Sequence, residues 1–79
     1  MRIDVLKRVY DAIQHHNVTY DESPSITEVA DACGYTFNRT RRAFRRLRDL
    51  GYIHWRERGH RTARIIKEWD IEYRNRFNL

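Results

Sequence analysis

The sequence has little of what secreted, membrane-spanning or zinc-binding proteins need. Its 79 residues include a single cysteine, Cys33, so neither an internal disulfide nor a cysteine-based zinc cluster can form. We expect Cys33 to be a small buried hydrophobic side chain, in a reducing compartment such as the cytoplasm. No apolar run approaches the ~18 residues of a membrane span, and the N-terminus does not resemble a signal peptide. We therefore expect a cytoplasmic, nucleoid-associated protein with no membrane partner.

Motifs that carry catalysis are also missing. The sequence has no HExxH, no paired cysteines and no glycine-rich phosphate loop. His15 and His16 are adjacent, so their rings diverge on a helix and do not chelate one metal as an i, i+4 pair would. We expect no enzymatic activity, no cofactor and no metal. The length fits one domain with a modest core, and the aromatic content of 13% argues against disorder.

Lysine is scarce, since fourteen of the sixteen cationic residues are arginine. Residues 1–35 carry a net charge of −3 and residues 67–79 a net charge of zero. Residues 36–66 hold ten arginines against Asp49 and Glu57, a net charge of +8. Such an uneven distribution indicates a basic face and a polyanionic partner. Arginine binds phosphate bidentately, which favours nucleic acid over the alternative of a merely soluble basic surface.

Hydrophobic periodicity predicts two helices before the basic segment. Residues 3–16 repeat apolar side chains at helical spacing, and the turn-rich residues 17–24 are expected to form a loop. A capping box between Ser25 and Glu28 is expected to begin a short second helix. Gly34 stands where a helix needs a residue that tolerates positive φ in order to end.

A third helix is predicted from a capping residue, Thr36, to about Leu50, and it contains six arginines. Its apolar side chains are those of Thr40, Ala43, Phe44, Leu47 and Leu50. On a helical wheel these fall within about 60° either side of one direction, which we expect to face the core. A disordered basic tail would need no such face, so we expect the arginines to point outward from a folded helix.

Alternating side chains after Gly51 predict a β-hairpin. Ile53 and Trp55, and then Ala63 and Ile65, alternate with polar residues on either side of a turn at Gly59. The second strand is expected to continue through residue 66.

The segment 67–79 is predicted to be a short tail. Trp69, Tyr73 and Phe77 are spaced as on one face of a helix, which we favour, although the first part of the segment also alternates as a strand would. These aromatic side chains can either close the small core against the first helix or dock another molecule. If the partner is a second copy of the chain, they form a homodimer.

Most of the chain resembles a winged helix-turn-helix DNA-binding domain of the bacterial and phage repressor type, such as the N-terminal domain of the LexA family. The resemblance lies in PSITEVADACGYTFNRTRRAFRRLRDLGYI and in the HWRERGHRTARI that follows. It implies an α+β, mainly α fold: three helices and a two-stranded hairpin wing form a domain over residues 1–66. LexA-type repressors carry a self-cleaving domain that is not found here. The turn before the third helix is one residue shorter here than in the LexA family, so the base-contacting positions of that family are not transferred to this sequence.

The resemblance implies sequence-specific binding to double-stranded DNA by a small transcriptional regulator. The helix at 36–50 would enter the major groove, and the wing at 56–61 would contact the backbone or the minor groove. The expected DNA-binding residues are Thr36, Asn38, Arg39, Arg41, Arg42, Arg45, Arg46, Arg56, Arg58, His60 and Arg61.

The helical wheel divides the arginines of the third helix. Arg41, Arg42 and Arg45 point away from the core and are expected in the groove, where arginine can bond guanine O6 and N7. Arg39, Arg46 and Arg48 lie at the edges of the apolar face, where phosphate contact is expected. Each of the six arginines can alternatively contact phosphate alone, without reading a base.

Two other functions fit the same residues. A DNA-architectural or recombination accessory protein, similar to phage excisionases, would use this fold to bend DNA. A winged-helix module that binds protein or RNA would instead use the aromatic tail. The sequence leaves these alternatives open.

Overall fold

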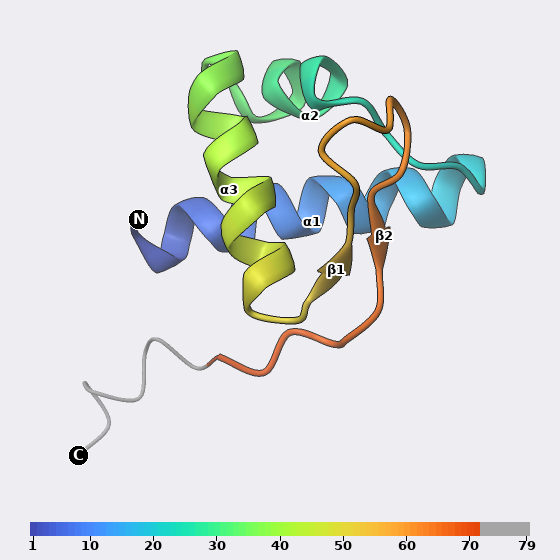
Figure 1. The fold of residues 1–79 in the computed structure, drawn as a ribbon. Coiled ribbons are helices and arrows are strands. Elements are labelled where there is room, and N and C mark those ends of the chain that lie inside the picture. The colour runs from blue at the N-terminus through green and yellow to red at the C-terminus, as the bar shows by residue number, and fades with distance from the viewer. Residues whose placement is uncertain (72–79) are drawn as a thin grey trace.

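The computed structural model describes residues 1–71, which form three helices followed by a two-stranded antiparallel sheet (Figure 1). The elements are α1 (Ile3–Tyr20), α2 (Ile26–Cys33), α3 (Phe37–Asp49), β1 (Ile53–His54) and β2 (Arg64–Ile65). Both α2 and α3 pack against α1, which α3 crosses, and the hairpin lies beside α3 (Figure 1). The predicted small, mainly helical α+β fold is confirmed.

α1 is longer than predicted. It runs to Tyr20, and Asp21 ends it in the left-handed region, with φ of 52°. The predicted start of a loop at residue 17 is therefore wrong. Asn17 favours turns by propensity, but here its side-chain amide bonds the backbone of Ala63 and of Ile65 in β2. A tertiary contact thus keeps this residue in the helix.

The predicted caps of α2 and α3 are confirmed. Ser25 Oγ accepts a hydrogen bond from the backbone N–H of Glu28 over 3.1 Å, and Glu28 Oε1 accepts one from the N–H of Ser25 over 2.8 Å. Gly34 ends α2 with φ of 73°, a conformation that glycine adopts without strain. Thr36 Oγ1 accepts from the N–H of Arg39 over 3.1 Å and begins α3. These caps mark the start and the end of α2 and the start of α3, with a short turn between the two helices.

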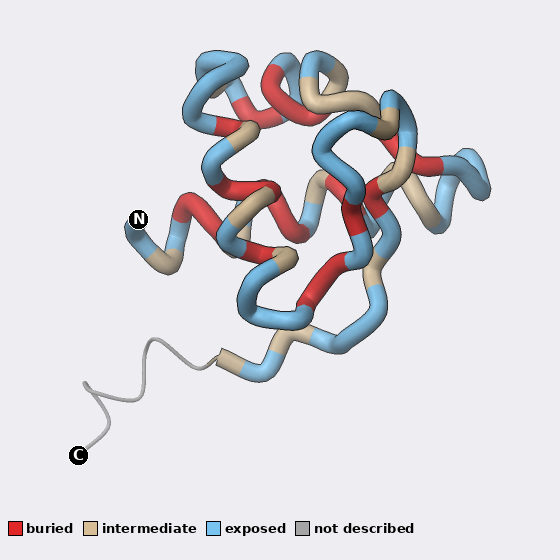
Figure 2. The backbone as a smooth tube through the Cα atoms, viewed as in Figure 1, coloured by how far each residue is buried: buried red, intermediate tan, exposed pale blue. Residues whose placement is uncertain are grey.

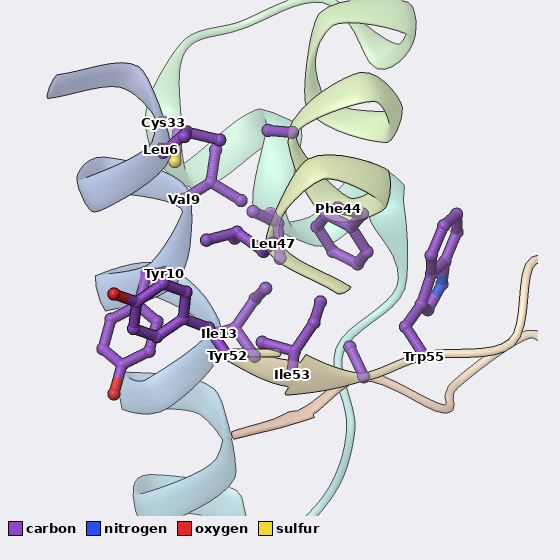
Figure 3. Close-up of a cluster of buried hydrophobic side chains, with 13 residues drawn as sticks. Leu6, Val9, Tyr10, Ile13, Cys33, Phe44, Leu47, Tyr52, Ile53 and Trp55 are labelled. Carbon is purple, nitrogen blue, oxygen red and sulfur yellow. The ribbon is translucent and has the colours of Figure 1, made fainter. Parts of the chain in front are cut away.

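The core lies where α1, α2, α3 and the hairpin meet (Figure 3). Its buried residues are Leu6, Val9, Tyr10, Ile13, Val29, Cys33, Ala43, Phe44, Leu47, Tyr52, Ile53, Trp55 and Ala63. Buried and exposed segments alternate along α3 (Figure 2), as the predicted apolar face requires. Burial raises the pKa of the Cys33 thiol above its ordinary value, which fits a structural side chain rather than a reactive one.

One predicted member of that face does not belong to the core. Leu50 is 38% exposed, because α3 ends at Asp49 and the chain turns at Leu50 and Gly51. Tyr52 follows the turn and is buried, and its backbone N–H donates to the carbonyl of Leu47 over 2.9 Å. Tyr52, after the turn, therefore joins the core, and Leu50 does not.

The predicted hairpin is confirmed, with shorter strands. β1 and β2 pair antiparallel, with Ile53 opposite Ile65 and His54 opposite Arg64. Ile66 lies outside β2 and is 63% exposed, although its N–H still donates a hydrogen bond to the carbonyl of Tyr52.

Residues 55–63 join the strands and are called the wing loop below. Thr62 Oγ1 accepts a hydrogen bond from the N–H of Arg56 and donates one to its carbonyl, over 2.9 and 3.2 Å. Gly59 donates its N–H to the same carbonyl over 2.9 Å, which confirms the predicted turn. A Cβ atom on Gly59 would overlap the side chain of Thr62, so this close approach requires glycine.

The start of the tail packs on the domain without forming a helix. Residues 67–71 are irregular, in contrast to the predicted helix. The Trp69 ring stacks on Tyr52 with centroids 5.1 Å apart and lies 5.4 Å from that of Tyr10. The Tyr10 hydroxyl donates to the carbonyl of Lys67 over 2.8 Å. For Trp69 the predicted role of closing the core is confirmed.

The other two aromatic residues of the predicted dimer contact, Tyr73 and Phe77, lie outside the described residues. Within residues 1–71, no helix is both long enough and apolar enough to cross a membrane.

Candidate nucleic-acid interface

The six arginines of α3 form two rows, because the helix buries its opposite face. Ala43, Phe44 and Leu47 are 0% exposed, so they hold α3 in one rotational setting. Arg41, Arg45 and Arg48 form the wing-side row, whose contacts are with the wing loop or with Asp49. Arg39, Arg42 and Arg46 form the outer row, on the other edge of the exposed face.

In the wing-side row, Arg41 and Arg45 share one acidic partner. Arg45 donates to Glu57 Oε1 from both Nε, over 2.8 Å, and Nη2. Arg41 Nη2 lies 3.6 Å from the same oxygen. The Arg45 hydrogen bond, reinforced by the nearby positive charges, lowers the pKa of the Glu57 carboxyl below its ordinary value. Glu57 therefore remains negatively charged between two guanidinium groups.

Arg48 completes the wing-side row. Its guanidinium carbon lies 5.5 Å from the centre of the Trp55 ring, a cation–π distance. Its Nε and Nη2 atoms also lie 3.3 and 3.2 Å from Asp49 Oδ1. The Arg48 side chain is therefore less exposed than those of Arg41 and Arg45, the other two members of the row.

The three arginines of the outer row are exposed, whereas those of the wing-side row are half-buried. The Arg39 guanidinium lies 4.9 Å from the centre of the Tyr35 ring. Arg42 and Arg46 lie at a shallow hollow of about 300 Å³. The hollow is lined by Met1, Arg42, Arg45, Arg46 and Asp49. Three arginines and one acidic residue line this open hollow, so its lining carries a net positive charge that favours an anion.

The predicted residues at the start of α3 lie at its exposed N-terminal end. The Thr36 hydroxyl serves as the N-cap, and Asn38 is exposed on the first turn. Since the first turn of a helix carries a partial positive charge, this end of α3 also favours an anion.

The wing loop adds a second basic surface. Arg56, Arg58 and His60 are exposed, and none of them forms an ion pair within residues 1–71. Their side chains are thus available to a partner beside α3.

Arg61 behaves differently from the other predicted wing residues. Its Nη1 and Nη2 atoms donate to the two carboxylate oxygens of Glu28 over 2.7 and 3.1 Å. Nη1 also lies 3.4 Å from the carbonyl of Ser23 and 3.5 Å from Glu22 Oε1. The backbone hydrogen bond from Ser25 and the bonds from Arg61 lower the pKa of Glu28 to about 2. Arg61 therefore joins the wing loop to the start of α2.

The structure brings together the predicted residues of α3 and the wing loop on neighbouring surfaces, with Arg61 turned toward α2. Sequence reasoning missed two residues that organise this region, Glu57 and Asn17. Glu57 had a usable signal, since it is one of only two acidic residues among the ten arginines of 36–66. Asn17 had none, because its partners in β2 are distant in the sequence.

Comparisons of this chain with models of known protein families, with curated proteins and with solved structures gave no match. The function is therefore argued from the geometry of the two basic surfaces.

Proposed function

We propose that this chain is a winged helix-turn-helix protein that binds double-stranded DNA in a sequence-specific manner, as a small transcriptional regulator. The observation that supports it most is the exposed face of α3, on which six arginines are held outward by a fully buried apolar face. The major groove of B-DNA admits one α-helix, and its guanine edges match the fork of arginine. In this proposal α3 lies in the major groove.

The wing loop supports the same proposal. Its exposed cations Arg56, Arg58 and His60 lie on the segment after α3, so they can contact the phosphate backbone or a narrow minor groove beside the helix. Arg61 is bound to Glu28, so its main contribution is to hold the wing loop in place.

The arginines of α3 divide by role in this proposal. Arg41, Arg42 and Arg45 lie farthest from the core side and are assigned to the groove. Arg39, Arg46 and Arg48 flank it and are assigned to phosphates. Phosphate contacts supply most of the affinity, and the groove contacts supply the sequence preference.

Selection of bound fragments from random DNA, followed by titration over a range of salt concentrations, tests this function. We expect an enriched motif, and a binding constant whose logarithm falls by ~0.9 per neutralised phosphate on a logarithmic salt scale. Arg42→Ala should weaken binding, because it removes an exposed guanidinium of α3. Arg64→Ala removes the same charge near Asp21 at the far end of α1 and is the matched control.

Two results would contradict the proposal. One is that no motif is enriched. The other is that the double variant Arg42→Ala, Arg45→Ala binds DNA as tightly as the wild type at low salt. The symmetry of the motif also tests whether the chain binds as a homodimer, which predicts two half-sites about one helical turn apart.

A further inference from the structure

Glu57 is an acidic residue placed inside a basic surface. One of its oxygens, Oε1, accepts both Nε and Nη2 of Arg45 and lies 3.6 Å from Arg41 Nη2. An acidic side chain here opposes binding of a polyanion by adding negative charge. Its presence at the meeting point of two guanidinium groups therefore suggests a role other than attraction of DNA.

The support beneath Glu57 is firmly anchored. Trp55 is 5% exposed, and its ring packs edge-on against Phe44 of α3 with centroids 5.4 Å apart. Arg56, between Trp55 and Glu57, has its backbone bonded to Thr62 Oγ1 in both directions. The carboxylate is thus attached to a segment whose position relative to α3 is set by the core.

The bonds to Glu57 leave a defined part of Arg45 available. A guanidinium has five N–H donors in one plane, and Glu57 engages the edge formed by Nε and Nη2. Both hydrogens of Nη1 and the second hydrogen of Nη2 remain, on the end of the group. Those donors form the fork that bonds guanine O6 and N7. The Arg45 side chain is 43% exposed, so it is open to a partner on the surface of α3.

From this geometry we infer that Glu57 is a positioning residue for base recognition: it orients Arg45 so that its terminal fork meets guanine in the major groove. The inference rests on the proposed function. An arginine that is held in one rotamer loses less conformational entropy on binding. The bonds to Glu57 also disfavour a swing of Arg45 to a phosphate when the base is wrong, which increases discrimination.

The test begins with the motifs that wild type and Arg45→Ala select from random DNA. The position whose preference is lost in Arg45→Ala identifies the base that Arg45 contacts. Affinities for the selected site, for a site changed at that base and for random DNA are then measured for two Glu57 variants. Because the side chain is exposed, both variants should fold, which thermal unfolding checks.

Glu57→Gln should lower the preference at that position by about tenfold and increase affinity for random DNA, since one negative charge is removed. Glu57→Asp keeps the charge but shortens the side chain, so it should lower the preference without increasing affinity for random DNA. Glu68→Gln removes an exposed carboxylate from the tail and should leave the preference unchanged.

The outcomes separate the inference from the proposed function. If wild type binds selectively and Glu57→Gln binds all sequences more tightly with the same preference, Glu57 is only a competitor of phosphate and the inference fails. It also fails if Arg45→Ala loses no position of the motif. If wild type itself shows no preference, both the inference and the proposed function fail.

Discussion

Asn17 Oδ1 accepts a hydrogen bond from the backbone N–H of Ile65 over 3.0 Å, although 48 positions separate the two residues. The Nδ2 group of Asn17 donates to the carbonyl of Ala63 over 3.2 Å. One side-chain amide therefore bonds β2 and the residue just before it on the edge opposite β1, much as the backbone of a third strand would. α1 thus holds the hairpin on the side away from α3.

Asn17→Ala should lower the free energy of unfolding by about 1–3 kcal/mol, because a backbone donor and a backbone acceptor lose their partner. Urea unfolding measures this loss, and faster hydrogen exchange of the Ile65 amide would locate it. Gln14→Ala, at an exposed position of the same helix, should change stability little. Equal stability of Asn17→Ala and wild type would show that the amide bonds do not hold the hairpin.

Leu47 and Leu50 look alike in the sequence pattern but differ in the structure. Leu47 is 0% exposed, so Leu47→Ala should cost about 2–5 kcal/mol through lost burial and the cavity it leaves. Leu50→Ala should cost less than about 1 kcal/mol, because Leu50 is 38% exposed. Unfolding of the two variants side by side checks the difference, and similar losses would place Leu50 in the core after all.

Glu28 should make the free energy of unfolding decrease at acid pH. Its folded pKa of about 2 lies below the ordinary value of 4.5, so the folded state favours the charged form. Its contribution is complete above pH 4.5 and is lost as the pH falls toward 2. Urea unfolding across this range should show a decline that Glu28→Gln removes in part, since other carboxyls also titrate there.

Arg61→Ala tests how much of the Glu28 pH dependence comes from the ion pair between these two residues. The largest cause of the low pKa is the backbone hydrogen bond from Ser25, which this variant keeps. Arg61→Ala should therefore reduce the Glu28 part of the pH dependence without abolishing it. Asp31→Asn, which removes an exposed carboxylate of α2, should retain the wild-type decline. A Glu28→Gln profile parallel to that of wild type would contradict the proposed linkage.

Trp69→Ala should destabilise the domain, because the ring packs on both Tyr10 and Tyr52. Each aromatic contact contributes about 0.5–1.5 kcal/mol beyond the buried area. Thermal unfolding measures the loss, with Glu68→Ala as an exposed neighbouring control. Sedimentation of both variants adds a second readout. A change of oligomeric state without a loss of stability would favour an intermolecular role for Trp69.

Local chemistry was enough to predict the ends of α2 and the start of α3. The bonds between Ser25 and Glu28 and the cap at Thr36 join residues three positions apart, so short motifs contain all that is needed. The buried face of α3 was equally predictable, because the helical repeat places Ala43, Phe44 and Leu47 together. The outward direction of the arginines follows from the same repeat.

Tertiary packing decided which acidic groups Arg45 and Arg61 meet. Arg45 bonds Glu57 twelve positions away, and Arg61 bonds Glu28 thirty-three positions away. Periodicity tells which side of α3 faces the core, but it contains no information on what the wing loop places opposite the exposed side. That depends on how Trp55 packs against Phe44, and so does the position of Glu57 beside Arg45. The helical place of Asn17 was likewise beyond local reasoning, because its side chain bonds Ala63 and Ile65, which lie far along the chain.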